Sequence, residues 1–489
     1  MQLLRGRKGD GRGDHPSNSA ALVPREWPPS TPESAPFTPT DSPPPDFDEA
    51  SATTRGLRFG KLFFAGQDLG SVSFYNGLPV FSEKGQEWIH AMTGHSGVFP
   101  ALPGDPPSSA QPSLGLADLS LPEKSVVEDY LSFYRGSLVK LEFPVIDSIM
   151  FQETIRIAYG TSGIRVTHEE IAARACVLAF LSLCSIFWAK HCTTSRPIDG
   201  HVTGLKARNL LSAIPQDMSI TVLQAILMLC LHQVLSGQIT VSAIYHSHAC
   251  RITFMLGGHV LSDPWETPVE SVGAAHWTPQ EKRQLRKLFW LCYAIDKEIS
   301  LRTGQPPSIS DDHCDLTLPS GYHEMQYLDE YLYAFPERLD ESAVPLLPGD
   351  LRLTMIKSKA CRLLYSADAL RKSDADLLRD IRELDEELES WRLSVPPKHR
   401  PALSLSVEAP RWPSSDLPRS IRTIVVNFEY QHLMMTIHQA TSRCRAWTVE
   451  RGLELNSVKS SMAIAVEASR STLLTLKPVV HELLEEATW

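Results

Sequence analysis

Acidic side chains are concentrated in the stretch Asp311–Asp315, which reads Asp-Asp-His-Cys-Asp. This order fits the DDxxD pattern, whose carboxylates can hold magnesium and a diphosphate when they line an apolar cavity from one face of a helix. Pro306, Pro307 and Pro319 bracket the stretch, and proline disfavours a continuous helix. We therefore predict that these acids form a solvated loop or cap a helix rather than bind a metal.

Other residues with catalytic potential lack the partners that the chemistry needs. His168 and Glu169 begin like a zinc-protease helix, but Ala172 stands where the second histidine would be. No GxSxG, P-loop or GxGxxG sequence occurs. The sequence predicts no catalytic, cofactor-binding or metal-binding residue. Histidines and cysteines within or next to apolar helical patterns are expected to be structural: His246, His248, His259, Cys176, Cys184 and Cys192.

Asp296 is a carboxylate that the helical pattern places in the core. The segment Glu281–Thr303 has apolar residues at helical spacing, and Asp296 falls inside this apolar stripe. A buried carboxylate without a partner costs several kcal/mol or more. Arg251, in the preceding helical segment, is the predicted partner in a structural core pair with Asp296. Two alternatives remain open, namely local bonding to the backbone and the anchoring of a small molecule.

The totals describe a globular protein without a basic surplus. The 489 residues carry a net charge of −10, from 47 basic and 57 acidic side chains, which argues against nonspecific attraction of the whole chain to nucleic acid. Nine cysteines include no CxxC pair, so reduced, intracellular thiols are expected. The uncharged stretch Ala175–Ala189 is shorter than the roughly 20 residues that span a bilayer. We expect a soluble protein without a membrane partner.

The chain divides into three parts by composition. Residues 1–56 are rich in Pro, Ser and Gly and are predicted to be disordered. Residues 57–116 combine an aromatic and glycine-rich segment with a second Pro/Ser linker, and a short strand is expected only near Val72–Phe74. Residues 117–489 show helical periodicity throughout, which predicts an all-α fold with a large multi-helix domain. The predicted helices are Lys124–Leu141, Asp147–Tyr159, His168–Cys192, Val202–Ser212, Ile220–Leu235, Thr240–Leu256, Glu281–Thr303, Leu328–Phe335, Leu351–Leu393, Arg419–Arg445 and Val458–Leu476.

Several segments, in this order, resemble the regulatory region of fungal zinc-cluster transcription factors. The most specific is Arg286-Lys287-Leu288-Phe289-Trp290, then Asp296-Lys297-Glu298-Ile299-Ser300, then Gly304-Gln305-Pro306-Pro307. The flanking segments that carry the resemblance are Leu121–Phe151 with its Phe-Pro-Val-Ile turn, His248–His259, Ile381–Trp391 and His432–His438.

The family reads DNA through six cysteines around two zinc ions, and here the first cysteine is Cys176, inside an apolar helix. We expect that the zinc cluster is absent from this chain, which therefore has no cofactor, and that DNA is bound only through that missing part. A truncated gene model, a processed fragment and a true relative without the cluster all remain open.

The resemblance implies a regulator of RNA polymerase II transcription in the nucleus, without enzyme activity. Its expected partners are regulatory proteins or a small-molecule effector, and a homodimer is also considered. One alternative is a protein-binding corepressor module that never had a DNA reader. The other is an all-α enzyme similar to terpene synthases, using Asp311–Asp315. The second metal motif of that family is missing, since Asn456 and Ser460 are followed by Ile464.

Overall fold

The computed structural model describes the chain in ten stretches. All of them belong to one compact unit, Thr53–Trp489. The predicted disordered tail 1–56, the linker at 101–116 and the predicted helix Leu328–Phe335 lie outside these stretches. The described residues are 61–64, 67–72, 79–94, 120–160, 166–191, 197–260, 277–327, 344–403, 417–444 and 456–486.

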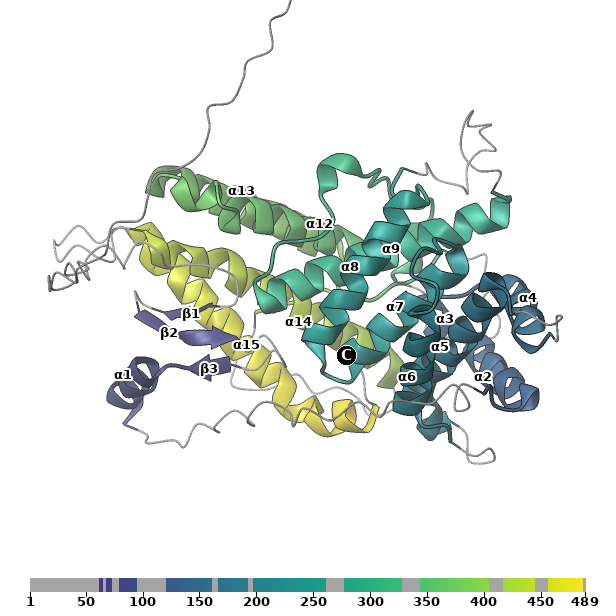
Figure 1. Cartoon of the computed structure of the whole chain (residues 1–489). Helices are drawn as coiled ribbons and strands as arrows, with labels where there is room; N and C mark the ends of the chain where they lie inside the picture. Colours follow the sequence, from purple (N-terminus) through teal and green to yellow (C-terminus); the bar gives the residue numbers. More distant parts are fainter. Residues whose placement is uncertain are drawn as a thin grey trace, which may run out of the picture. The chain divides into compact units, whose positions relative to one another are not determined.

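A small antiparallel sheet precedes the helices. Its strands β1 (Lys61–Phe64), β2 (Gln67–Val72) and β3 (Pro79–Phe81) pair in the order β1-β2-β3 (Figure 1). Helix α1 (Glu83–Thr93) follows β3, and the Ser82 side chain caps it by accepting a hydrogen bond from the Gly85 N–H. The sequence pattern anticipated only one short strand in this region, because glycines interrupt the alternation of side chains that marks a strand.

The first helical group forms the larger hydrophobic core. Every helix predicted before residue 304 is found, with one correction: the predicted Lys124–Leu141 helix is broken at Ser137 into two. The helices of this group are α2 (Lys124–Gly136), α3 (Val139–Glu142), α4 (Ser148–Tyr159), α5 (His168–His191), α6 (Gly200–Leu211), α7 (Ile220–Leu235), α8 (Ile239–Met255) and α9 (Pro279–Thr303).

Helix α5 runs through the middle of this group and packs against α4, α6 and α7. From His168 to Trp188 it is long and apolar enough to cross a membrane, which the shorter uncharged stretch seen in the sequence did not suggest. Most of that stretch is buried inside the protein, as in the core helix of a globular domain. Glycines allow α6 to approach closely, since a Cβ at Gly200 would lie 2.0 Å from Ser185 Oγ on α5.

Helix α9 contains the most specific part of the family resemblance, and its ends follow from local sequence. Thr278 and Glu281 form a reciprocal capping box, and Pro279 occupies the first turn, where its missing N–H costs nothing. Gly304 ends the helix with a φ of 72°, a left-handed conformation that favours glycine. Residues 284–301 are buried, so this helix is enclosed on all sides by its neighbours.

The second helical group forms a smaller core. The predicted continuous helix Leu351–Leu393 is wrong: α12 passes into a π-helical turn, Cys361–Tyr365, and α13 starts afresh at Asp374. Ser373 caps α13 by accepting from the Asp376 N–H, a start signal inside the predicted helix. The helices of this group are α12 (Leu351–Ala360), α13 (Asp374–Ser394), α14 (Leu417–Gln439) and α15 (Asn456–Glu486), with α14 packed along α15 (Figure 1). The short helix α10 (Tyr322–Met325) instead contributes Tyr322 to the larger core.

Candidate functional site

Asp296 is 2% exposed, and its partners are the neighbouring Lys297 side chain and backbone N–H groups of the segment that follows α9. Its Oδ1 accepts from the Ser308 N–H at 2.8 Å, and its Oδ2 accepts from the Ile309 N–H at 3.1 Å. The Lys297 ammonium donates to the same Oδ2 at 3.0 Å. Asp296 therefore ties the Gly-Gln-Pro-Pro exit of the helix back onto the helix itself.

The predicted pair between Arg251 and Asp296 is wrong. Arg251 is exposed on α8, whereas Asp296 is buried and has the other partners just described. Of the alternatives left open by the sequence, bonding to backbone N–H groups matches the structure. The helical period placed Asp296 in the core correctly, but it could not show that the chain returns after Gly304 to satisfy it.

The acidic cluster is part of the same arrangement rather than a metal site. Residues 311–313 form a 3₁₀ turn, and Asp311 Oδ1 accepts from the Tyr293 hydroxyl at 3.0 Å and the Ser358 hydroxyl at 2.8 Å. Asp312 is exposed, and Asp315 accepts from the Thr317 N–H at 2.9 Å. Asp311, Asp312 and Asp315 do not form a group whose ligand atoms all lie within 4.8 Å of one another, so the diphosphate-binding interpretation loses its geometric basis.

A second buried charge network links α9 to α12 and α14. The Lys357 ammonium, 1% exposed, contacts the Glu298 carboxylate and lies 3.5 Å from Glu429 Oε1. Burial alone would raise the pKa of Glu298, but the charges of Lys357 and Arg302 lower it to about 2. Burial opposes protonation of Lys357, yet its two carboxylate neighbours raise its pKa. The network is a structural connection that sequence patterns did not reveal.

Arg286, in the Arg-Lys-Leu-Phe-Trp segment, makes contacts that connect three parts of the chain. Its guanidinium is stacked 4.7 Å from the ring centroids of Phe289 and Trp290, and it is almost fully buried. It donates to the carbonyl oxygens of Asp315 at 2.5 Å and Gly258 at 3.3 Å. One arginine thereby joins the end of α8, α9 and the segment after the acidic turn.

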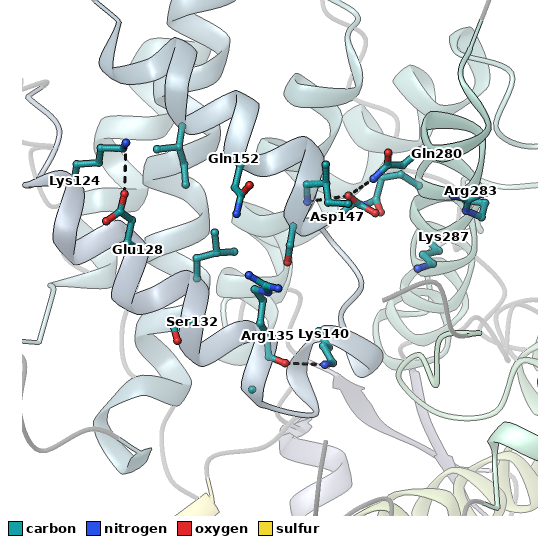
Figure 2. Close-up of a pocket in the computed structure, with 16 residues that line it drawn as sticks. Lys124, Glu128, Ser132, Arg135, Lys140, Asp147, Gln152, Gln280, Arg283 and Lys287 are labelled. Carbon is teal, nitrogen blue, oxygen red and sulfur yellow. Dashed lines mark hydrogen bonds and ion pairs between the residues drawn. The ribbon is translucent and has the colours of Figure 1, made fainter. Parts of the chain in front are cut away.

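A large polar pocket opens between α2, α3, α4 and the first turns of α9 (Figure 2). Its volume is about 970 Å³. The charged side chains that line it are mostly basic: Lys124, Arg135, Lys140, Arg283 and Lys287, against Glu128 and Asp147. Basic residues thus outnumber acidic ones here, although the whole chain carries a net charge of −10.

The walls of this pocket are held in place by specific contacts. Asp147 caps α4 through the N–H groups of Ile149 and Met150, and it also accepts from the Gln280 side chain at 2.6 Å. Lys140 donates to the Arg135 carbonyl at 2.7 Å. The pocket is therefore formed mainly by secondary structure, and it was missed in the sequence because its basic residues come from segments more than 100 residues apart.

A smaller pocket of about 360 Å³ lies where the Gly-Gln-Pro-Pro exit meets the π-helical turn. Pro306 and Pro307 line one side, and Cys361 and Tyr365 line the other. Asp311 also lines this pocket. The Lys297 ammonium lies 3.7 Å from Asp311 and 3.0 Å from Asp296, so the pocket adjoins the contacts that hold Asp296.

The regions that carry these contacts match a known family. Residues 141–393 match the model of the fungal specific transcription factor domain, which is just over half of the chain. The chain belongs to this family. The matched region includes α9, the Asp296 arrangement and the Glu298–Lys357 connection. The resemblance seen in the sequence is confirmed.

Curated relatives of this family member are named as regulators of transcription. An ABC-transporter-regulating transcription factor of Aspergillus oryzae is 30% identical over 213 residues, covering 42% of this chain and 22% of the relative. A protein of the same name from Aspergillus fumigatus is 34% identical over 170 residues, covering 35% and 18%. The fusaridione A cluster transcription factor of Fusarium heterosporum is 28% identical over 152 residues, covering 30% and 25%.

The matched region makes up about a fifth of the length of the two Aspergillus relatives. No solved structure matches the chain. The family and these relatives are transcriptional regulators rather than enzymes. The chain therefore contains a regulatory domain of the fungal transcription factor type. The all-α fold predicted from helical periodicity is also confirmed.

Proposed function

We propose that this chain acts in the nucleus as the regulatory domain of a transcription regulator of RNA polymerase II genes. The family match and the regulators among its relatives support this role. The sequence has no cysteine before Cys176, so DNA binding of the zinc-cluster type, with the zinc ions of that cluster, would come from sequence outside it.

The large polar pocket between α2, α3, α4 and α9 binds a small anionic effector, and this binding regulates the activity of the domain. The volume of about 970 Å³ suits a drug-sized molecule, and the excess of basic side chains favours carboxylate or phosphate groups. The positive ends of α4 and α9 reach the same pocket, which adds to the attraction for an anion. Arg283, on the first turns of α9, is only partly buried and can reach a ligand.

A tethered reporter assay tests this function. The full chain, fused to an unrelated DNA-binding domain, should change transcription of a reporter gene that carries the matching site. The Lys124→Glu/Arg283→Glu variant should lose most of this response, because two attractive charges in the pocket become repulsive. Arg371→Glu is the matched control, since Arg371 is 78% exposed and does not line the pocket.

Ligand binding is measured separately with citrate and inorganic pyrophosphate as probes. Each reversed charge should weaken binding at least roughly tenfold, which corresponds to about 1.4 kcal/mol. A tethered chain that leaves the reporter unchanged would contradict the regulatory function. A response that the pocket variant keeps in full would contradict the effector site and favour a protein-binding corepressor module.

A further inference from the structure

Four side chains with metal-binding atoms face one another between α8 and α9. His246 and Cys250 stand four residues apart on α8, and Cys292 and Asp296 stand four residues apart on α9, so each pair shares one face of its helix. All four are at most 2% exposed. Of these four residues, His246 and Cys292 lie outside the segments that carry the family resemblance.

The hydrogen bonds determine which nitrogen of His246 is available. His246 Nε2 lies 3.0 Å from the Cys292 carbonyl oxygen, which can only accept, so Nε2 carries the hydrogen and Nδ1 keeps its lone pair. That Nδ1 lies 3.7 Å from Asp296 Oδ1 and 3.7 Å from Cys250 Sγ, which is 3.3 Å from Nε2. An imidazole lone pair and a carboxylate oxygen therefore face each other, and a cation between them would attract both.

These separations agree with the edges of a zinc tetrahedron. Bond lengths of about 2.0–2.3 Å from zinc to nitrogen, oxygen and sulfur imply ligand atoms about 3.3–3.8 Å apart. The donor atoms of His246, Cys250 and Asp296 all lie within 4.8 Å of one another. The Cys292 thiol interacts with the Cys250 thiol and lies 3.5 Å from the Thr253 hydroxyl. It lies outside the group of three, and its thiol would have to turn towards them to supply a fourth ligand.

We propose that His246, Cys250, Cys292 and Asp296 bind one zinc ion that cross-links α8 to α9. The two thiols lose their protons to solvent when the metal binds, and no other bond changes. Two thiolates, one carboxylate and the Lys297 ammonium beside it then balance the 2+ charge, so the buried cluster is neutral. Four protein ligands without an open position are typical of a structural zinc site, and zinc accepts nitrogen, sulfur and oxygen ligands.

The surrounding bonds support this arrangement. The Cys292 carbonyl holds the far nitrogen of His246, in the way that metal-bound histidines are commonly oriented. The Ser308 N–H holds Asp296 Oδ1, and the other oxygen is occupied by Lys297 and the Ile309 N–H. Two of the ligands are thereby fixed in orientation without the metal.

The test uses the full chain, purified under reducing conditions, with zinc and cobalt as probes. The chain should keep about one zinc per molecule after gel filtration. Cobalt added to the metal-free chain should give the near-ultraviolet charge-transfer bands of thiolate ligation together with the visible bands of a tetrahedral ion. Zinc should also raise the melting temperature of the metal-free chain by several degrees.

Cys250→Ser should abolish the cobalt–thiolate bands and the zinc-dependent rise in melting temperature. Cys184→Ser is the matched control, because Cys184 is equally buried but lies on α5, and it should keep both. Absence of thiolate bands in the unaltered chain would overturn the proposal and leave His246 beside Asp296 as a metal-free structural pair. Bands that persist in Cys250→Ser would overturn it as well, and neither result depends on transcriptional activity.

Discussion

Replacing Lys357 by methionine should lower the free energy of unfolding by about 3–5 kcal/mol, a large part of the stability of a typical domain. Methionine fills a similar volume but removes the buried ammonium that lies between the Glu298 and Glu429 carboxylates, and Glu298 then keeps the more exposed Arg302 at 3.4 Å. The cost is therefore that of two buried carboxylates that lose the cation they share, rather than of a single lost contact. Urea unfolding, followed by circular dichroism, measures it.

Lys359→Met is the matched control for this change. Lys359 also contacts two glutamates, Glu383 and Glu387, but all three side chains are at least partly exposed. Exposed ion pairs contribute about 0–1 kcal/mol, so the control should lose no more than that. Equal urea midpoints for Lys357→Met and Lys359→Met would show that the Lys357 cluster is not a buried network.

The same network gives the protein a defined loss of stability in acid. The pKa of Glu298 is lowered from 4.5 to about 2 in the folded state, so its contribution is complete above pH 4.5 and is lost as the pH falls towards 2. His432 and His232 lower the stability at a higher pH than Glu298 does, because burial lowers the pKa of each from 6.5 to about 4. Unfolded chains bind these protons first, so stability should begin to fall below pH 6.5.

Sequence patterns predicted the helices because hydrophobic periodicity reports burial directly. Asp296 was placed in the core by the helical period alone, and the structure confirms that it is buried. Its partners could not be predicted, since they depend on how the chain turns after Gly304. Arg251 was predicted because it lies in the preceding helical segment. The observed donors are Lys297 and the backbone N–H groups of residues 308 and 309.

Contacts between distant segments were hidden from the sequence for the same reason. Glu298 and Lys357 meet across 59 residues, and Gln280 meets Asp147 across 133. Neither pair has a local pattern, because each side chain looks like an ordinary charged residue on its own helix. The end of the helix at Tyr365 was not predicted for another reason. Apolar spacing continues through the π-helical turn Cys361–Tyr365, so the period alone did not show that the helix ends there and that α13 begins at Asp374.

Replacing Asp296 by alanine should destabilise the fold by about 3–5 kcal/mol and loosen the chain between Gly304 and Asp311. The change removes the acceptor of three hydrogen bonds at once, from Ser308, Ile309 and Lys297. The Lys297 ammonium, which is fully buried, then keeps the Ile309 carbonyl at 2.5 Å, the Tyr293 ring with its centroid at 4.8 Å, and a more distant Asp311 carboxylate at 3.7 Å. Urea unfolding in the presence of EDTA measures this loss without any contribution from bound metal.

A double variant separates the ion pair from the hydrogen bonds to the loop. Asp296→Ala/Lys297→Met removes both charges, and it should be more stable than Asp296→Ala alone because no buried ammonium remains without its carboxylate. Asp312→Ala is the control, since Asp312 is exposed on the same turn, and it should stay within about 0.5 kcal/mol of the unaltered chain. If the two single changes at 296 and 297 simply add, the two side chains do not act as a pair, and Asp296 stabilises the fold only through the N–H groups of the loop.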